Sequence, residues 1–194
     1  MGMLRAFIAS EVPTAIQDAI GVASSGLRAR SNAGLVRWVP LRNIHLTLKF
    51  LGDVSVSSLE LIRKMLATEA PKYPAFDLVV EGLGAYPNVR RPRIVWAGVT
   101  APDELRLLQA GIEAAAVRLG YASEDRAYSP HLTIGRVRRN PSTTDLGALA
   151  GELASSRAGT LGRLRVDAIH VFRSDLHPTG AVYTKLFGAR LDAT

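Results

Sequence analysis

One tripeptide occurs twice in this chain, as His45-Leu46-Thr47 and as His131-Leu132-Thr133. Each copy lies in an alternating apolar run of the kind that forms a β-strand, residues 43–50 and 130–136. Successive side chains of a strand point to opposite faces, so the histidine and the threonine of each copy share a face. Two such pairs facing each other would surround a small anion with two imidazoles and two hydroxyl groups. We therefore expect acid–base chemistry at a phosphate.

Histidine is the side chain whose ordinary pKa lies nearest neutrality, so one imidazole can accept a proton while a second, still charged, donates one. A pair that flanks a phosphodiester could activate an attacking hydroxyl group or water and protonate the departing oxygen. Thr47 and Thr133 could hold the non-bridging phosphate oxygens. Arg136, at the end of the second run, is the best candidate for a charge-assisted contact with the phosphate.

The residues after the first copy are assigned to faces by the same alternation. Strict alternation would place Lys49 on the face of the histidine and the threonine. It would place Phe50 on the opposite face, so parity favours packing of this ring in the core. Phe50 precedes Leu51-Gly52, however, where the strand could end and release the ring toward the histidines. An aromatic ring there could stack on a nucleic-acid base.

A metal site is the main alternative for paired histidines. Zinc is usually held by three or four protein ligands, several of them close in sequence. The residue two positions after each histidine is threonine, a poor zinc ligand, and no cluster of Asp or Glu adjoins either histidine. The chain has no cysteine, which excludes disulfides, thiolate metal sites and a cysteine nucleophile. We therefore expect neither a metal nor a cofactor.

The composition bounds the class of protein. The 194 residues, 47% of them hydrophobic, can form one compact domain or two small lobes with a substantial core. A net charge of +7 favours an anionic partner, and nucleic acid is the first candidate. The first nine residues are too short an apolar run for a signal sequence, and no stretch approaches the roughly 20 apolar residues of a membrane span. We expect a soluble, cytoplasmic protein.

The strands that carry the two copies belong to a series of elements that occurs twice. The first series comprises a strand at 3–9, a helix at 14–30, the first histidine strand at 44–51, a helix from 57 and a strand at 76–83. The second comprises a strand at 93–98, a helix with Pro102 in its first turn that reaches about residue 119, the second histidine strand, a helix from 142 or 143, and strands at 161–173 and 180–188. Capping boxes are predicted at Ser57 with Glu60 and at Thr100 with Asp103.

The offset between the two series is nearly constant. The second histidine follows the first by 86 residues (131 − 45), and the strand containing Arg93 resembles the one containing Arg5 at an offset of 88 (93 − 5). This predicts a single bilobal catalytic domain spanning residues 1–194, with a quasi-repeat of about 3–86 and 92–188. An approximate two-fold axis would bring both motifs to a shared cleft. A chain that alternates strands and helices without duplication is the alternative.

The doubled His-x-Thr-x motif resembles the signature of the two-histidine (2H) phosphoesterases. Its setting is similar to that in the bacterial and archaeal RNA 2′,3′-cyclic phosphodiesterases, historically called 2′–5′ RNA ligases, or LigT-like proteins. The resemblance runs from about residue 3 to residue 187. The matching segments outside the motifs are Arg5-Ala6-Phe7-Ile8-Ala9, Trp38-Val39-Pro40, Phe50-Leu51-Gly52, Arg91-Pro92-Arg93, Trp96, Pro130, Arg136 and Gly180-Ala181-Val182-Tyr183.

The resemblance implies a fold and a reaction. The fold would be α+β and bilobal, with two antiparallel sheets related by a pseudo-two-fold axis around a central groove and helices on the outside. The reaction would be metal-independent hydrolysis of RNA 2′,3′-cyclic phosphate ends to 2′-phosphomonoesters. His45 would be the proton donor and His131 the proton acceptor. The residues that would bind the phosphate or flank the terminal base are Thr47, Thr133, Arg136 and Phe50.

The partner implied is RNA with a 2′,3′-cyclic phosphate end, and the substrates could include tRNA fragments and small cyclic nucleotides. The protein would act as a monomer and would bind no membrane. Two other functions remain open. One is 2′–5′ RNA ligation, the reverse chemistry at the same site, which needs two RNA ends held together. The other is a non-catalytic module that grips RNA phosphates, with salt-dependent binding and no turnover. Retention of both histidines speaks against this module.

Overall fold

The strands of this protein form one curled, antiparallel sheet. The computed structural model describes residues 2–31, 34–178 and 180–193. The order of strands is β7-β4-β5-β6-β3-β1-β8-β9, and β2 pairs with β6 outside this path. Every pairing between these strands is antiparallel. The fold is therefore mixed α+β, as the sequence predicts.

The bounds of the elements follow the predicted series closely. The strands are β1 (Met3–Glu11), β2 (Val36–Trp38), β3 (His45–Ser55), β4 (Phe76–Tyr86), β5 (Ile94–Thr100), β6 (His131–Val137), β7 (Thr160–Val166), β8 (Ala168–His177) and β9 (Gly180–Arg190). The α-helices of the described residues are α1 (Thr14–Arg30), α2 (Leu59–Glu69), α3 (Asp103–Arg118) and α4 (Thr143–Ser155). Short 3-10 turns are η1 (Leu41–Asn43), η2 (Val56–Ser58) and η3 (Ala70–Lys72). The strand predicted at 161–173 is in fact two, β7 and β8.

The two sheets expected from the resemblance are two halves of the one sheet. The first half-sheet contains β3, β1, β8 and β9, and the second half-sheet contains β7, β4, β5 and β6. The halves are joined through β3 and β6, whose ladder consists of one residue pair, Leu46 with Leu132. Because a single pair imposes little constraint on the angle between strands, the halves can diverge on either side of it. The sheet is thus narrowest where its two halves join.

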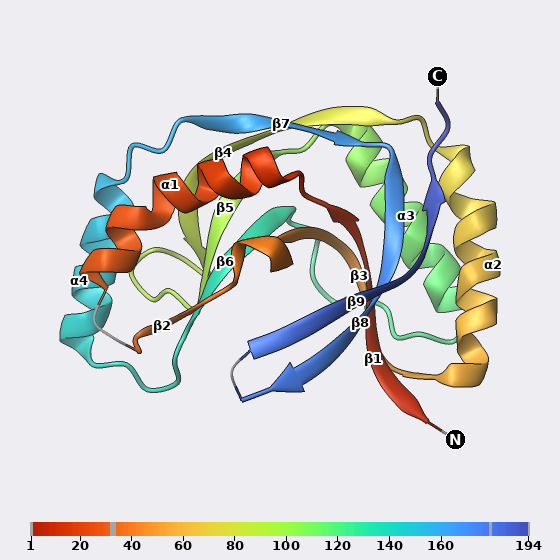
Figure 1. Cartoon of the computed structure of the whole chain (residues 1–194), viewed down its shortest axis with the longest axis horizontal. Helices are drawn as coiled ribbons and strands as arrows, with labels where there is room; N and C mark the ends of the chain where they lie inside the picture. Colours follow the sequence, from red (N-terminus) through yellow and green to blue (C-terminus); the bar gives the residue numbers. More distant parts are fainter. Residues whose placement is uncertain (1, 32–33, 179, 194) are drawn as a thin grey trace.

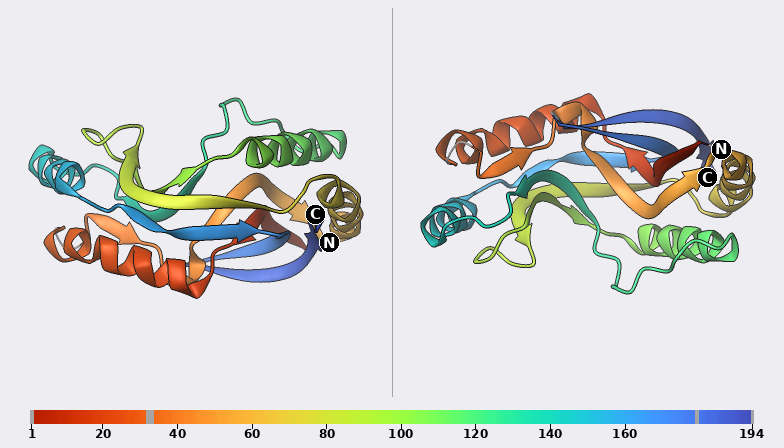
Figure 2. Two further views of the ribbon diagram at one scale, coloured as in Figure 1. Left: turned by 90° about the horizontal axis from the view of Figure 1, so that it is seen from above. Right: turned by 90° about the horizontal axis from the view of Figure 1, so that it is seen from below.

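The polypeptide crosses between the two half-sheets (Figure 1). β4, from the first half of the chain, pairs with β5 and β7, whereas β8, from the second half, pairs with β1. The helices cross as well, because α1 packs against β7 and α4, and α3 packs against β3 and α2. Figure 2 shows α1 and α4 toward one end of the strands, and α2 and α3 toward the other end. The series strand–helix–strand–helix–strand recurs in the chain, while the quasi-repeat of 3–86 and 92–188 stays a prediction.

The main core lies between the helices and one face of the sheet. Leu46 and Leu132 are fully buried in it, and so are apolar residues of all four helices. The helical members include Ile16, Ile20, Ile62, Leu66, Leu108, Ile112, Leu149 and Leu153. Burial of such a side chain stabilises the fold by roughly 1.5–3 kcal/mol. A small second cluster of Phe7, Ala9 and Phe172 lies on the other face of the first half-sheet.

α1 begins at residue 14 and α4 at residue 143, as the sequence predicts. Ser142 precedes α4, and its hydroxyl oxygen accepts a backbone N–H of the first turn at 3.0 Å. The capping boxes predicted for α2 and α3 are wrong. Before α2, the Ser55 hydroxyl caps the turn η2 by accepting the N–H of Ser58. Before α3, the Thr100 hydroxyl donates to Glu81 on the neighbouring strand instead.

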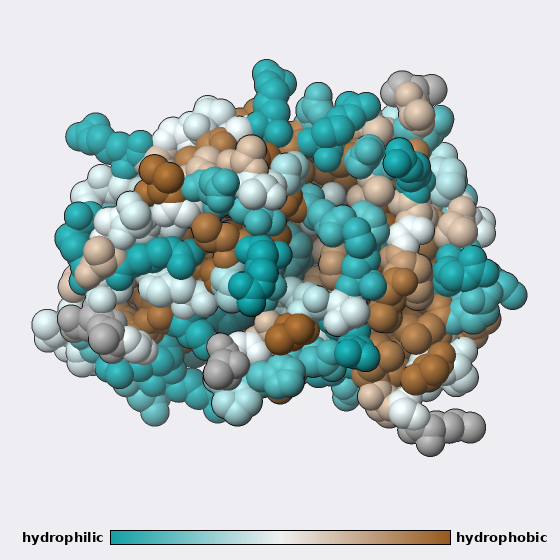
Figure 3. Space-filling view, viewed as in Figure 1, coloured by the Kyte–Doolittle hydropathy of each residue, from teal (hydrophilic) through white to brown (hydrophobic). Residues whose placement is uncertain are grey.

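Hydrophilic residues cover most of the face of the molecule shown in Figure 3. A hydrophobic area at its lower right lies over β1 and the start of α2. Met3 of β1, Val56 of η2 and Leu61 of α2 are each more than half exposed. Within the described residues, no helix combines the length and the apolar character that a bilayer crossing requires.

Candidate active site

The two copies of the His-Leu-Thr motif meet where the half-sheets join. His45 is the first residue of β3, and His131 is the first residue of β6. The middle residues of the two motifs, Leu46 and Leu132, are the single pair that connects the strands. Both leucines are fully buried on the helix side. The histidines and threonines, one residue away on either side, therefore point to the opposite face.

This register determines which side chains face each other. In an antiparallel pair centred on the two leucines, His45 lies across from Thr133, and Thr47 lies across from His131. Each histidine thus has a threonine of the other motif as its neighbour. We call this surface the motif face, defined by these four residues. All four are partly exposed on it, so an anion could reach two imidazoles and two hydroxyl groups together.

The same backbone contact holds both imidazoles in one tautomer. The Nδ1 of His45 is 2.7 Å from the carbonyl oxygen of Asn43, and the Nδ1 of His131 is 2.8 Å from that of Ser129. A carbonyl oxygen can only accept a hydrogen bond, so each Nδ1 carries the proton. In the neutral rings Nε2 is then unprotonated and free to accept a proton from a ligand.

His45 is enclosed by aromatic rings of the first half-sheet. It stacks on Phe7, with ring centroids 4.6 Å apart, and meets Tyr183 edge-on at 5.2 Å. Phe7 stacks in turn on Phe172 at 5.3 Å. Burial lowers the pKa of His45 to about 4, against the smaller opposite effect of the Asn43 carbonyl. In the free protein at neutral pH this imidazole is therefore uncharged.

His131 has a more open environment in the second half-sheet. The ring of Tyr86 meets it edge-on at 5.0 Å, and the Tyr86 hydroxyl contacts the hydroxyl of Ser129 at 2.6 Å. Burial lowers the pKa of His131 too, and the positive charge of Arg136 contributes. Arg136 acts on His45 in the same direction. A bound phosphate anion would oppose this charge at both imidazoles.

A β-bulge in β3 reverses two of the sequence predictions. Thr47 pairs with Ala9 and Lys49 pairs with Ile8, so Leu48 is an extra residue without a partner on β1. Alternation shifts by one after it. Lys49 points into the core with 1% exposure, and Phe50 is 57% exposed. The predictions that Lys49 shares the histidine face and that Phe50 packs in the core are therefore wrong.

β6 contains the same irregularity at the equivalent place. Thr133 pairs with Trp96 and Gly135 pairs with Val95, so Ile134 is the extra residue. The first six residues of β3 and β6 then have one burial pattern, in which the sixth is exposed. That sixth residue is Phe50 in β3 and Arg136 in β6, 86 positions apart (136 − 50). The two bulges bring an aromatic ring and a guanidinium group to the motif face.

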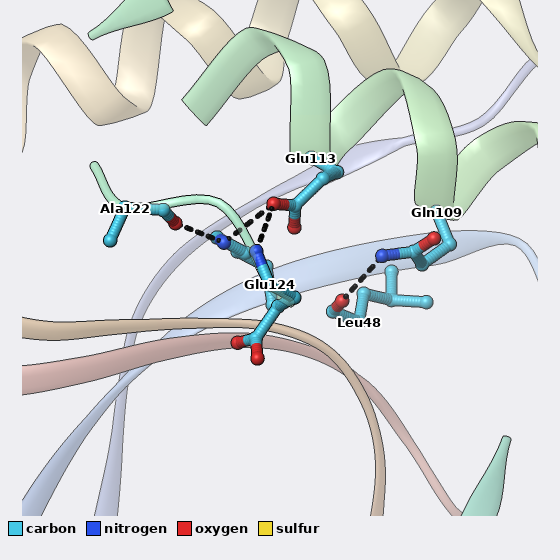
Figure 4. A network of polar contacts seen from close by, with 6 residues as sticks. Leu48, Gln109, Glu113, Ala122 and Glu124 are labelled. Carbon is cyan, nitrogen blue, oxygen red and sulfur yellow. Dashed lines mark hydrogen bonds and ion pairs between the residues drawn. The ribbon is translucent and has the colours of Figure 1, made fainter. Parts of the chain in front are cut away.

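A buried network fixes the bulge of β3 from the helix side (Figure 4). The Nζ of Lys49 is 2.8 Å from Oε1 of Glu113 on α3, and it donates to the carbonyl oxygen of Ala122 at 2.6 Å. The same carboxylate oxygen accepts the N–H of Glu124 at 2.9 Å. A buried ammonium group is tolerated when it is paired and hydrogen-bonded in this way.

The backbone carbonyls on either side of the bulge are also held. The Nε2 of Gln109 donates to the carbonyl oxygen of Leu48 at 3.4 Å, and the Tyr128 hydroxyl donates to that of Thr47 at 2.9 Å. Tyr128 lies three residues before His131, so the segment that leads to the second motif also supports the first. Three consecutive residues of β3 are thereby tied to α3 and the chain that follows it.

The structure thus brings the two histidines, the two threonines, Arg136 and Phe50 to the motif face, whereas Lys49 points into the core. It adds aromatic residues that sequence reasoning did not select, chiefly Phe172 and Tyr86, which carry no motif of their own. Another histidine, His170 of β8, lies beside Phe172, and its Nε2 is 3.9 Å from Oε2 of Glu11. Among the described residues, no three His, Cys, Asp or Glu side chains gather as a metal site would require.

The sequence matches one family model and is similar to named proteins of known sequence. A model of the 2′-5′ RNA ligase superfamily matches residues 13–178. The RNA 2′,3′-cyclic phosphodiesterase of Methanothermobacter thermautotrophicus is 34% identical over 188 residues, which cover 97% of this chain and 99% of that protein. The protein of the same name from Archaeoglobus fulgidus is 31% identical, and the match covers 94% of this chain and 98% of that one.

Solved structures give the same comparison in three dimensions. A crystal structure of a Thermus thermophilus protein matches with a TM-score of 0.78 and 27% identity, covering 98% of this chain and 99% of that chain. The elements described above are therefore arranged as in this solved structure.

The buried ion pair predicts a marked loss of stability when one partner is removed. Lys49→Met would leave the Glu113 carboxylate facing the core without its cation, so we expect the free energy of unfolding to fall by about 3 kcal/mol. Lys64→Met is the matched control, because Lys64 is exposed and 3.9 Å from Glu60, and its loss should cost less than about 1 kcal/mol. Urea unfolding measures both. A loss in Lys49→Met no larger than in the control would contradict the network.

The enclosure of His45 predicts a dependence of stability on pH. Its pKa in the folded protein, about 4, lies below the ordinary value near 6.5 of the unfolded chain. Its contribution to stability is therefore complete above pH 6.5 and is lost as the pH falls toward 4. We expect His45→Gln to flatten the decline of the unfolding free energy between pH 6.5 and 4. His177→Gln, which changes an exposed histidine, should leave this decline unchanged. Equal slopes in the wild type and His45→Gln would be evidence against the enclosure.

Proposed function

The chain belongs to the 2′-5′ RNA ligase superfamily, and from that membership we propose that it hydrolyses RNA 2′,3′-cyclic phosphate ends to 2′-phosphomonoesters. The observation that carries the proposal is the pairing of Leu46 with Leu132, which turns both His-Leu-Thr motifs to one face. Two imidazoles with free Nε2 atoms and two hydroxyl groups on one face match what in-line displacement at phosphorus needs. The relatives named for this activity are similar over nearly their whole length.

In the proposed reaction the cyclic phosphate lies between the two imidazoles. Nε2 of His131 accepts a proton from a water molecule, whose oxygen attacks phosphorus as the bond to the 3′ oxygen breaks. Nε2 of His45 donates a proton to that departing 3′ oxygen, so the products are a 2′-phosphate and a free 3′-hydroxyl group. Before the next turnover, His131 releases the proton that it accepted and His45 takes up a new one, both by exchange with solvent.

Three further side chains would stabilise the reacting phosphate. Thr47 and Thr133 would donate hydrogen bonds to the non-bridging oxygens, each from across the strand pair. Arg136 would add a charge-assisted contact as negative charge accumulates there. Because Arg136 is held on the motif face by the bulge of β6, its approach to the phosphate needs no rearrangement of the strand.

The proton donor needs the substrate in order to be charged. Burial holds the pKa of His45 at about 4 in the free protein, so the imidazole is neutral there at pH 7. The cyclic phosphate carries a negative charge that favours the imidazolium form and offsets the charge of Arg136. We infer that His45 gains its proton as the substrate binds, which restricts acid catalysis to the occupied site.

The proposed substrate is an RNA end, from tRNA fragments or other RNAs, and small 2′,3′-cyclic nucleotides. Phe50 would flank the terminal base, since its ring is 57% exposed and lies 6.2 Å from the ring of Phe7 on the motif face. The net charge of +7 supports a polyanionic partner. We propose further that the protein acts as a monomer in the cytoplasm.

Ligation through a 2′–5′ bond is the second candidate, and the family description favours it. It would reverse the same displacement, with a 5′-hydroxyl group attacking in place of water. Incubation of two RNA halves held together by base pairing would reveal it as a joined product that resists a nuclease specific for 3′–5′ bonds. A protein that only grips RNA would bind these halves and convert neither end.

Replacement of either histidine should lower turnover by orders of magnitude. Turnover by the wild type should need no metal ion. We expect His45→Ala and His131→Ala each to lower kcat on an oligonucleotide with a 2′,3′-cyclic phosphate end by about 10²–10⁴-fold. The wild type should be equally active in EDTA and should release only the 2′-phosphate, identified against 2′- and 3′-phosphate standards. Circular dichroism controls for folding. Near-full turnover by His45→Ala would refute the mechanism.

The direction of proton transfer can be tested with a better leaving group. A substrate whose 3′ oxygen is replaced by sulfur needs little protonation of the departing atom, because a thiolate is a far weaker base than an alkoxide. If His45 is the donor, this substrate should restore most of the rate lost in His45→Ala and little of that lost in His131→Ala. The opposite pattern would exchange the two assignments.

A further inference from the structure

Two arginines stand side by side at one end of the motif face. Arg37 of β2 and Arg136 of β6 are paired across the two strands, and Arg136 is also paired with Ile94 of β5 on its other side. The three residues form one row across the sheet. Partners in an antiparallel pair project to the same face of the sheet. Arg37 is therefore the neighbour, one strand further out, of the guanidinium group proposed for the reacting phosphate. Sequence analysis did not single it out.

Neither arginine has a counter-ion in the part of the chain that the structure describes. Both are exposed, and no carboxylate of residues 2–31, 34–178 and 180–193 lies within 4.0 Å of either guanidinium group. Adjacent strands lie about 4.8 Å apart, and like charges directly opposite each other are destabilising. By contrast, Arg138, two positions after Arg136, is paired with Asp145 at 3.2 Å. The row thus retains uncompensated positive charge where the motif face ends.

Arg37 extends from one half-sheet toward the other. β2 is attached to β6 of the second half-sheet, yet the Nη2 of Arg37 lies 4.0 Å from the point where a Cβ on Gly180 would stand. Gly180 begins β9 of the first half-sheet. The turn η1, which follows β2 in the chain, also contacts β9, since Nδ2 of Asn43 donates to the carbonyl oxygen of Ala181 at 2.8 Å. The guanidinium group therefore lies between the half-sheets, as the motif face does.

The surroundings continue this positive charge. The loop before β5 contains Arg90, Arg91 and Arg93, all exposed, and the carbonyl oxygen of Arg93 accepts the N–H of Val137 at 2.9 Å. The loop is thereby fixed beside the end of β6. Hydrophilic residues also dominate the surface over the loop after β6, at the lower left of Figure 3. An anion longer than a single phosphate would meet arginines along this path.

We propose that Arg37 binds a second phosphate of the substrate, the internucleotide phosphate on the 5′ side of the terminal nucleotide, while Arg136 faces the cyclic phosphate. The proposal rests on the function proposed above. A guanidinium group suits this contact because its fork of donors can bind two oxygens of one phosphate. The site would thereby prefer the end of an RNA chain to a free nucleoside 2′,3′-cyclic phosphate.

The test compares three substrates that differ in that phosphate. They are adenosine 2′,3′-cyclic phosphate, the same compound with a 5′-phosphate, and the dinucleotide ApA with a 2′,3′-cyclic phosphate end. We expect Arg37→Gln to lower kcat/KM on the last two by about ten- to a hundredfold more than on the first, mainly through KM. Arg37→Lys should recover part of the loss. Arg106→Gln, at an exposed arginine of α3, is the matched control and should change none of the three.

The dependence on salt gives a second readout. Loss of one phosphate contact should lower the slope of log KM against log salt concentration for the dinucleotide by about one. Loss of the same factor on all three substrates, or no loss on any, would overturn the proposal for Arg37. A loss on the dinucleotide without one on the 5′-phosphorylated compound would overturn it too, because the contact would then involve the second nucleoside.

Binding separates this proposal from the proposed reaction. If the wild type hydrolyses none of the three substrates, the proposed function fails. Calorimetry with ApA ending in a 3′-phosphate, compared with adenosine 3′-phosphate, still measures the second contact. Tighter binding of the dinucleotide that is lost in Arg37→Gln would support the site even then, and equal binding of both compounds would exclude it.

Discussion

The arrangement of this protein depends on one contact between two strands, the pairing of Leu46 with Leu132. It is the narrowest part of the sheet, and both leucines are fully buried under the helices. Burial of the middle residue of each motif forces its neighbours to the other face, because side chains alternate along a strand. Hydrophobic packing on one side thus delivers two histidines and two threonines to the other. A shift of register by one residue would bury the polar side chains and expose the leucines.

Much of this could be predicted from the sequence, since its signals are local or repeated. Short sequence patterns predict the two motifs and the strands that contain them, because apolar and polar residues alternate there. The helical period of apolar residues predicts most of the helices. The bulges are not, because an extra residue is defined only by the partner strand that passes it. Leu48 and Ile134 have no sequence feature that marks them as unpaired. The side-chain directions of Lys49 and Phe50 consequently could not be predicted by parity, and the Lys49–Glu113 pair joins residues 64 positions apart.

The two motifs are nearly identical in sequence, but their surroundings differ. His45 is packed between rings contributed by β1 and β9, whereas His131 meets one tyrosine edge-on. The stronger burial of His45 lowers its pKa to about 4. These rings come from strands far from either motif in sequence, so no local pattern carries the asymmetry. A near-symmetric pair of motifs can therefore hold two imidazoles of unequal basicity, as a reaction with one donor and one acceptor requires.

The crossing of the chain between the half-sheets has a consequence for synthesis on the ribosome. The strand that ends the first half, β4, has neighbours only in the second half, and β1 remains without β8 until residue 168 or later has emerged. The growing chain must therefore stay open, with apolar strand surface unprotected, until β8 has been synthesised. Tyr183, which closes the wall around His45, lies in β9 and follows β8 along the chain. Competence for chemistry is thus acquired only after β9 has been synthesised.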